Sequence, residues 1–282
     1  MSVDTAVVER AAKWCKLDPN ETTSKHVEAL LAILATTDDE RSAEAACEEL
    51  SSLFPNDRIG FGTAGLRSEM KPGPMGMNDL VVIQAAQGIA KYVLQENEVK
   101  EGQKLRVVIG YDHREMQSFS LSSLSFAIQS ALVFEEAGLE VILLEGLVAT
   151  PLVPYTLKKK NAAVGIMITA SHNPKNDNGY KVYWSNGCQI RPPVDKGIAD
   201  SILDNLVPWV DYGALLQERR KEHSEDPSLG LADTDTTKEM ISSYFDSIQK
   251  CGLVSGQADL AKSSNSWNPP SIAYTGTIEF PR

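Results

Sequence analysis

The chain has 282 residues, of which 42% are hydrophobic and 23% charged, and its formal net charge is -11. This composition is typical of a globular protein and excludes a membrane-spanning chain, and the acidic balance argues against nucleic acid and an anionic membrane as partners, since both need a basic face. Its 4 cysteines form no C-x-x-C pair, and the N-terminus lacks a basic start followed by an apolar core, so we expect a cytoplasmic protein without structural zinc or disulfides.

Apolar residues at spacings of three and four predict helices through the first fifty residues, which we interpret as an N-terminal helical extension over 1–50. The character of the sequence changes at Phe61. The segments FGTAGLR (61–67) and KPGPMGMN (71–78) are rich in glycine and proline and predict a polar loop.

Helices and strands then alternate, beginning with a helix that Asn78 is placed to cap. The predicted elements are that helix from 79 to 97, a strand at 105–111, a helix at 118–137 stopped by Gly138, a strand at 140–146, a short helix after Pro151 and a strand at 162–169. This order predicts an α/β fold, a layered α/β/α sandwich with a mixed, largely parallel sheet.

The elements predicted after residue 169 alternate less regularly. They are a strand pair at 179–184 and 187–192 joined by a turn at 185–187, a helix at 194–206, a polar loop at 221–236, a helix at 237–250 and a Ser, Asn, Pro and Gly-rich linker at 255–271. Asp233 and Asp235 resemble the carboxylates of a metal-binding loop, but the neighbouring residues favour an ordinary polar loop.

Functional loops of such sheets lie at the carboxyl ends of the strands. Three loops meet that description: 110–114 (GYDHR), 146–151 (GLVATP) and 168–179 (ITASHNPKNDNG). Ser171 in the third loop follows an apolar strand and sits in a turn made by Asn173-Pro174, so its hydroxyl can be exposed beside backbone N–H groups. This arrangement suits a phosphorylated serine.

Nearby cations support an anion site in this acidic chain, because phosphate recognition needs positively charged donors. They are His172, Lys175, Lys181 and Arg191. Ordinary turn formation explains the same residue types, and both interpretations remain open. A serine hydrolase is disfavoured, because Ala170-Ser171-His172 is no G-x-S-x-G elbow.

Four separately placed motifs carry a resemblance to a known family. FGTAGLR, GYDHR, ATPLVPY and TASHNPKNDNGYKVYWSNG, in that order over residues 50–205, resemble the first domain of the α-D-phosphohexomutase superfamily, in particular its phosphoglucomutase-2 and phosphopentomutase branch. The resemblance implies a first α/β domain at 51–252 and a linker with a truncated start of a second domain at 253–282. It also implies an intramolecular phosphotransferase that interconverts sugar 1-phosphate and sugar 5- or 6-phosphate.

In this family the serine of the motif, here Ser171, carries the phosphoryl group and binds Mg²⁺ through its phosphate. The resemblance makes Arg67 its neighbour and His172 and Lys181 acid/base or phosphate-contact candidates. It implies a sugar bisphosphate as intermediate and activator, and the substrate-binding candidates that it suggests are Thr63, Gly65, Arg67, Asn173 and Lys175. We interpret Asp112 and Arg114 as an ion pair that fixes the loop in which both residues lie.

Three later motifs of the family are not found: a DGDxDR-type magnesium loop, a sugar-reading GEES-like loop and an R-x-SGTEP phosphate site. We therefore expect a truncated form, and two hypotheses stay open. The chain represents a magnesium-dependent mutase acting on glucose 1-phosphate, ribose 1-phosphate or deoxyribose 1-phosphate, or it is an inactive fragment that serves as a phosphosugar-binding or regulatory module.

Overall fold

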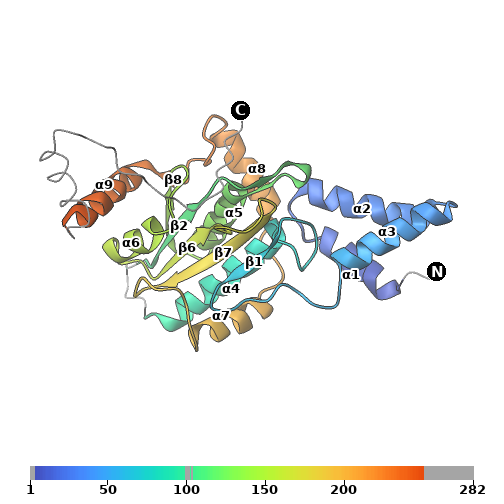
Figure 1. Cartoon of the computed structure of the whole chain (residues 1–282), viewed down its shortest axis with the longest axis horizontal. Helices are drawn as coiled ribbons and strands as arrows, with labels where there is room; N and C mark the ends of the chain where they lie inside the picture. Colours follow the sequence, from blue (N-terminus) through green and yellow to red (C-terminus); the bar gives the residue numbers. More distant parts are fainter. Residues whose placement is uncertain (1–3, 99–101, 103, 251–282) are drawn as a thin grey trace, which may run out of the picture.

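The chain is built around a mixed sheet, shown in the computed structural model of Figure 1, which describes residues 4–98, 102 and 104–250. The strand order in the described residues is β1-β7-β6-β2-β5-β8. Strands β2, β5, β6 and β8 are parallel, whereas β7 is antiparallel to both β6 and β1. The strands are β1 (Leu66–Glu69), β2 (Arg106–Tyr111), β5 (Glu140–Leu144), β6 (Val164–Ile168), β7 (Asp177–Trp184) and β8 (Ala232–Asp233). The predicted mixed, largely parallel sheet is confirmed.

Helices cover both faces of this sheet (Figure 1). Val107 and Ile109 of β2 pack into the core under α4, α5 and α7, while Val108 between them packs into a second core with α6 and α9. Alternate residues of one strand therefore face two apolar layers, as expected for a sheet buried on both sides. The helices are α4 (Asp79–Glu96), α5 (Ser123–Glu136), α6 (Leu152–Lys159), α7 (Val194–Leu203), α8 (Tyr212–Glu222) and α9 (Thr234–Lys250). Among the helices described, none has the length and apolar character needed to cross a bilayer.

Helix boundaries follow local capping. The Asn78 side chain accepts a hydrogen bond from the Val81 N–H, which confirms the predicted N-cap of α4, and Gly138, at φ 84°, ends α5 as predicted. The predicted start of α5 at 118 is wrong. A one-turn 3₁₀ helix (η1, Gln117–Phe119) and Ser120, at φ 53°, connect the short paired strands β3 (Glu115–Met116) and β4 (Leu121–Ser122), and Ser122 then caps α5.

Other differences come from backbone pairing that composition does not reveal. The end of the FGTAGLR motif is a strand rather than a loop, because β1 pairs with residues 177–180 of β7. The predicted strand at 187–192 is only a single bridge between Tyr183 and Gln189. Strand β8 and the first turn of α9 occupy part of the predicted polar loop, and α8 was not predicted. The predicted linker at 255–271 lies outside the described residues.

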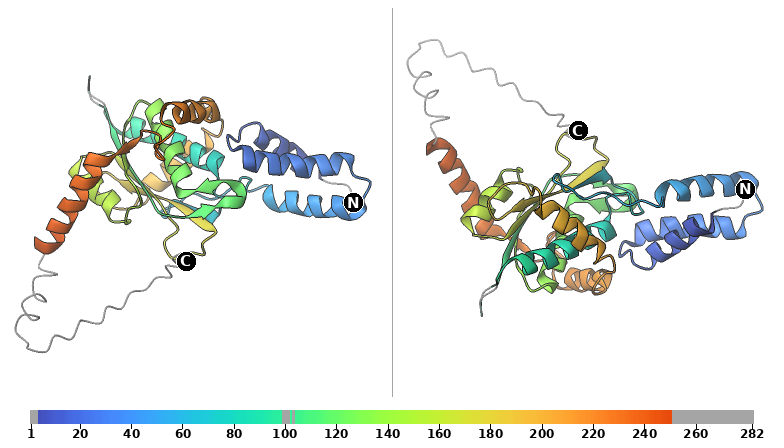
Figure 2. Two further views of the ribbon diagram at one scale, coloured as in Figure 1. Left: turned by 90° about the horizontal axis from the view of Figure 1, so that it is seen from above. Right: turned by 90° about the horizontal axis from the view of Figure 1, so that it is seen from below.

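The first three helices form a unit of their own beside the sheet (Figures 1 and 2). They are α1 (Thr5–Cys15), α2 (Glu21–Thr36) and α3 (Glu40–Leu53). Trp14, Val27 and Leu50 bury their side chains between these helices, and Leu80 of α4 joins the same cluster. The boundary at residue 50 stays a prediction; helix α3 runs past it to Leu53.

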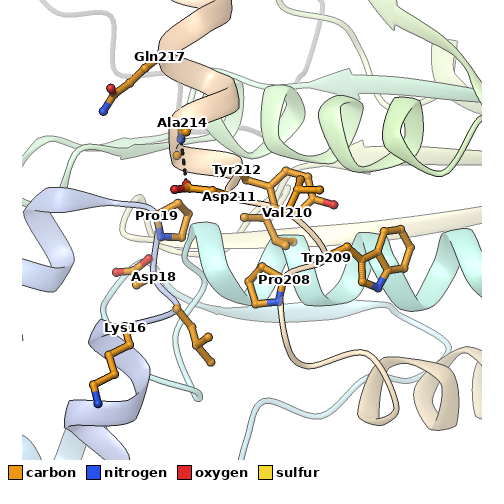
Figure 3. A pocket seen from close by; sticks show the side chains of 13 residues that line it. Lys16, Asp18, Pro19, Pro208, Trp209, Val210, Asp211, Tyr212, Ala214 and Gln217 are labelled. Carbon is orange, nitrogen blue, oxygen red and sulfur yellow. Dashed lines mark hydrogen bonds between the residues drawn. The ribbon is translucent and has the colours of Figure 1, made fainter.

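Two carboxyl groups lie where this helical unit meets the sheet domain. Asn20 caps α2 and donates from Nδ2 to Asp79 Oδ2 at 2.8 Å, while Thr23 Oγ1 donates to Asp18. Burial raises the pKa of Asp18 to about 8 and that of Asp79 to about 6. Asp18 lines a cleft of about 670 Å³ between the two units, opposite Trp209 and Tyr212 (Figure 3).

The buried carboxyl groups of Asp18 and Asp79 predict that the stability of the protein depends on pH. An acid whose pKa is raised by folding holds a proton that the unfolded chain releases, so the free energy of unfolding falls as pH rises from the unfolded pKa, about 4, toward the folded value. Between about pH 6 and about pH 8, we expect the free energy of unfolding of Asp18→Asn to decrease less than that of the wild type, by on the order of 1 kcal/mol. Urea unfolding at several pH values measures it.

Asp39→Asn is the matched control, because Asp39 is an exposed helix cap whose pKa is lowered rather than raised. Its profile should run parallel to that of the wild type above about pH 6. An unchanged pH slope in Asp18→Asn would contradict the assignment.

Candidate active site

The three predicted loops do meet at one edge of the sheet. Tyr111 at the end of β2 is in register with Ile168 at the end of β6, and the Asp112 N–H donates to the Ile168 carbonyl at 3.1 Å. The Val148 N–H of the 146–151 loop donates to the Tyr111 carbonyl, also at 3.1 Å. The carboxyl edge of three neighbouring parallel strands therefore forms one surface.

Ser171 is exposed on this surface and is held in an uncommon backbone conformation. Its φ is 54°, in the left-handed region, and its N–H donates to Thr169 Oγ1 at 2.9 Å. Lys181 Nζ donates to Ser171 Oγ at 2.6 Å. A non-glycine residue keeps such a conformation only where its surroundings hold it, and such residues gather at functional sites.

Lys181 reaches Ser171 from strand β7. Its side chain is half-buried rather than fully exposed on the strand. Burial lowers the pKa of Lys181, and the charge of Arg67 lowers it further, while Asp112 opposes the shift. A lysine amine with a lowered pKa gives up its proton more readily than an ordinary lysine, and beside a hydroxyl oxygen it is placed for proton exchange.

Arg67 lies in β1, where it is in register with Gly179 of β7. Its Nη1 donates to Asn173 Oδ1 at 3.0 Å, and Asn173 Nδ2 donates in turn to Asp177 Oδ2 at 2.9 Å. Arg67 therefore stands over the Ser171 loop with an exposed guanidinium. Fixed cationic donors of this kind suit a phosphoryl group.

The other predicted site residues are placed less specifically. His172 and Lys175 are exposed on the same loop as Ser171, and Thr63 is exposed at the tip of the 62–65 turn. Their roles stay predictions. The pair Asp233 and Asp235 stands at the start of α9, where Asp233 Oδ1 accepts from the Thr236 N–H. No group of three His, Cys, Asp or Glu side chains suited to a metal occurs among the described residues.

Gly65 has a backbone reason to be glycine. It adopts φ 74°, and a Cβ at this position would collide with the carbonyl oxygen of Tyr180. Gly62 and Gly65 exchange backbone hydrogen bonds and close the turn that leads into β1. Gly65 thus lets β1 approach β7 and sets the position of Arg67.

Arg114 has contacts that the sequence did not predict. It forms the predicted ion pair with Asp112, at 3.2 Å from Nε to Oδ2, but its side chain is only 8% exposed and extends into the neighbouring loop. Its Nη atoms donate to four carbonyl oxygens there, those of Ser171, Asn173, Pro174 and Asp177. The sequence placed both loops at the carboxyl ends of strands, but their contact depends on β2 lying next to β6 in the sheet, and no signal in the sequence indicates that.

Gly65→Ala should destabilise the fold, because the Cβ must push β1 away from β7 in addition to straining φ. We expect a loss of about 2 kcal/mol or more of unfolding free energy. The control is Gly62→Ala in the same turn, where an added Cβ has nothing within 4 Å and φ is not positive. Denaturant unfolding of both variants measures the difference, and equal losses would contradict the explanation.

Residues 58–206, just over half of the chain, match the family model described as "Phosphoglucomutase/phosphomannomutase, alpha/beta/alpha domain I". The chain is 44% identical over 229 residues (81% of this chain, 35% of the relative) to "Probable phosphoribomutase" of Schizosaccharomyces pombe. It is 42% identical to "Phosphopentomutase" of Homo sapiens (73% of this chain, 31% of the relative) and 40% identical to "Glucose 1,6-bisphosphate synthase" of Homo sapiens (73% and 30%). The resemblance seen in the motifs is confirmed, and the chain spans about a third of the length of these relatives.

Proposed function

The chain belongs to the phosphoglucomutase/phosphomannomutase family, and we propose that it serves a phosphosugar mutase reaction in which Ser171 carries the phosphoryl group. The observation that carries the proposal is the 2.6 Å contact between Lys181 Nζ and Ser171 Oγ on an exposed loop at the carboxyl edge of the sheet. The reaction interconverts a sugar 1-phosphate with its 5- or 6-phosphate.

The proposed chemistry needs a carrier, a proton donor and a charge partner. Phosphoserine 171 gives its phosphoryl group to a free hydroxyl of the sugar phosphate: the serine O–P bond breaks, a sugar O–P bond forms, and the hydroxyl proton passes to water. Lys181 supplies a proton to the departing Ser171 oxygen. The sugar bisphosphate then returns its other phosphoryl group to Ser171: Lys181 takes back the proton of the Ser171 hydroxyl, and water supplies a proton to the sugar oxygen that is released. Arg67 stabilises the equatorial phosphoryl oxygens.

The substrate class follows from the relatives. The names of two of them refer to pentose or ribose phosphates, and the third is named for a glucose bisphosphate. We propose a phosphorylated sugar, with ribose 1-phosphate or deoxyribose 1-phosphate ahead of glucose 1-phosphate because the pentose-named relatives have the higher identities.

Magnesium is the expected cofactor of the family, but the described residues do not by themselves fit it. Hard cations need several oxygen ligands, and the carboxylates near Ser171 have other partners: Asp112 pairs with Arg114, and Asp177 accepts from Asn173. A phosphate on Ser171 would contribute oxygens to the metal.

Whether Ser171 carries the phosphoryl group is tested by measuring the intact mass of the chain after incubation with glucose 1,6-bisphosphate or ribose 1,5-bisphosphate. We expect one added phosphoryl group, located on Ser171 by peptide mapping and lost in Ser171→Ala. Ser68→Ala is the control, since Ser68 lies nearby in β1 with its hydroxyl bonded to the Met75 carbonyl. Labelling that persists in Ser171→Ala would refute the assignment. A coupled mutase assay separates an enzyme from a binding module.

Arg67→Lys tests the charge partner. Lysine keeps the charge but loses the planar fork, so we expect the rate of Ser171 phosphorylation to fall by about tenfold or more while the melting temperature changes little. Arg41→Lys, at an exposed position of α3, is the control. An Arg67→Lys variant that melts earlier yet is phosphorylated at the normal rate would show that Arg67 only braces the turn.

A further inference from the structure

We infer that Arg114 is the positioning residue of the Ser171 loop, an inference that rests on the proposed function for its catalytic meaning. The ion pair with Asp112 uses only one of its N–H groups. The other four point into a loop that begins more than fifty positions later in the chain, with separations of 57, 59, 60 and 63 residues.

The guanidinium uses its complete set of donors. Nη1 lies 2.7 Å from the Pro174 carbonyl oxygen and 2.8 Å from that of Asp177, and Nη2 lies 3.1 Å from those of Ser171 and Asn173. Nε completes the set on Asp112 at 3.2 Å. Arginine offers five N–H donors in one plane, whereas lysine offers only three from one atom. The site therefore specifies arginine rather than any cation.

These contacts fix the backbone on both sides of Ser171. Its N–H donates to Thr169 Oγ1, and its carbonyl oxygen accepts from Arg114, so neither peptide group is free to leave the left-handed conformation. The unusual φ of 54° directs the hydroxyl toward Lys181. Holding Arg114 in place thus holds the distance between the phosphoryl carrier and its proton donor.

A second row of contacts holds Arg114 itself. Asp112 Oδ1 accepts from the Ser123 hydroxyl at 2.6 Å and from the Arg114 N–H at 3.2 Å. Ser123 in turn accepts from Asn178 Nδ2 at 2.9 Å, and Asn178 is fully buried at the start of β7. The start of α5, the end of β2 and both ends of the Ser171 loop are therefore connected through Arg114 and Asp112. Preorganisation of this kind is what a reacting group needs.

The first experiment uses the wild-type chain. In ¹H–¹⁵N spectra the Nη hydrogens of Arg114 should appear as separate, slowly exchanging signals, because each is donated to a carbonyl oxygen, whereas an exposed arginine such as Arg41 should show averaged signals. The Arg114→Lys variant assigns the signals by their loss. Averaged signals for Arg114 would overturn the inference without any variant having to fold.

The second experiment compares Arg114→Lys with Arg106→Lys, an exposed arginine paired with Glu140 at the opposite end of β2. We expect the amides of Ser171, Asn173 and Asp177, which are hydrogen-bonded in the loop, to exchange about tenfold faster or more in Arg114→Lys only, while core amides of α4 keep their rates. Loop exchange that stays unchanged, or that rises equally across the core, would overturn the positioning role.

The third readout is the phosphorylation rate of Ser171 at saturating and limiting bisphosphate. Arg114→Lys should lower the saturated rate by about tenfold or more with a smaller effect on the half-saturating concentration. A normal saturated rate in this variant would overturn the inference. If wild-type Ser171 takes no phosphoryl group, the proposed function fails, while the spectra and the exchange rates still decide whether Arg114 holds the loop.

Discussion

The contact of one guanidinium with four carbonyl oxygens sets the shape of the whole candidate site. Arg114 is buried, and a buried cation must be compensated by a partner charge and by hydrogen bonds. Asp112 supplies the charge, and the Ser171 loop supplies the oxygens. The loop cannot open without leaving these donors unsatisfied, and this cost makes a left-handed Ser171 a stable feature of a solvent-exposed turn.

The remaining site residues depend on the reversal of the chain after β6. Because β7 runs antiparallel to β6, the residues that follow the loop return along the sheet, and Lys181 comes back level with Met167. Strand β1 then joins β7 at the edge and places Arg67 opposite Gly179. Strand pairing thus brings Arg67, which is distant in sequence, to Lys181 and the Ser171 loop, with Gly65 permitting the close approach of β1.

The sequence predicted the layered fold because its signals are local. Apolar runs, the Asn78 cap and the Gly138 stop each act within a few residues, and so did the turn residues that singled out Ser171. What it could not predict depends on partners distant in the chain. Strand β1 has four residues and exists through its pairing with β7, and the reach of Arg114 depends on the adjacency of β2 and β6. Neither the pairing of β1 with β7 nor the adjacency of β2 and β6 can be read from the spacing of residues in the sequence.

Charge gives the final constraint on the site. The chain is acidic overall, with a net charge of -11, so a dianionic phosphoserine is disfavoured at an average point on its surface. At Ser171 the local balance is different, because Lys181 and Arg67 stand on one side and the Arg114 guanidinium lies beneath the loop. Burial lowers the pKa of Lys181, and repulsion between its charge and that of Arg67 lowers it further. An incoming phosphoryl group would relieve that repulsion. The charge of Arg67, which adds to the effect of burial on the pKa of Lys181, is therefore also a charge that favours phosphate at Ser171.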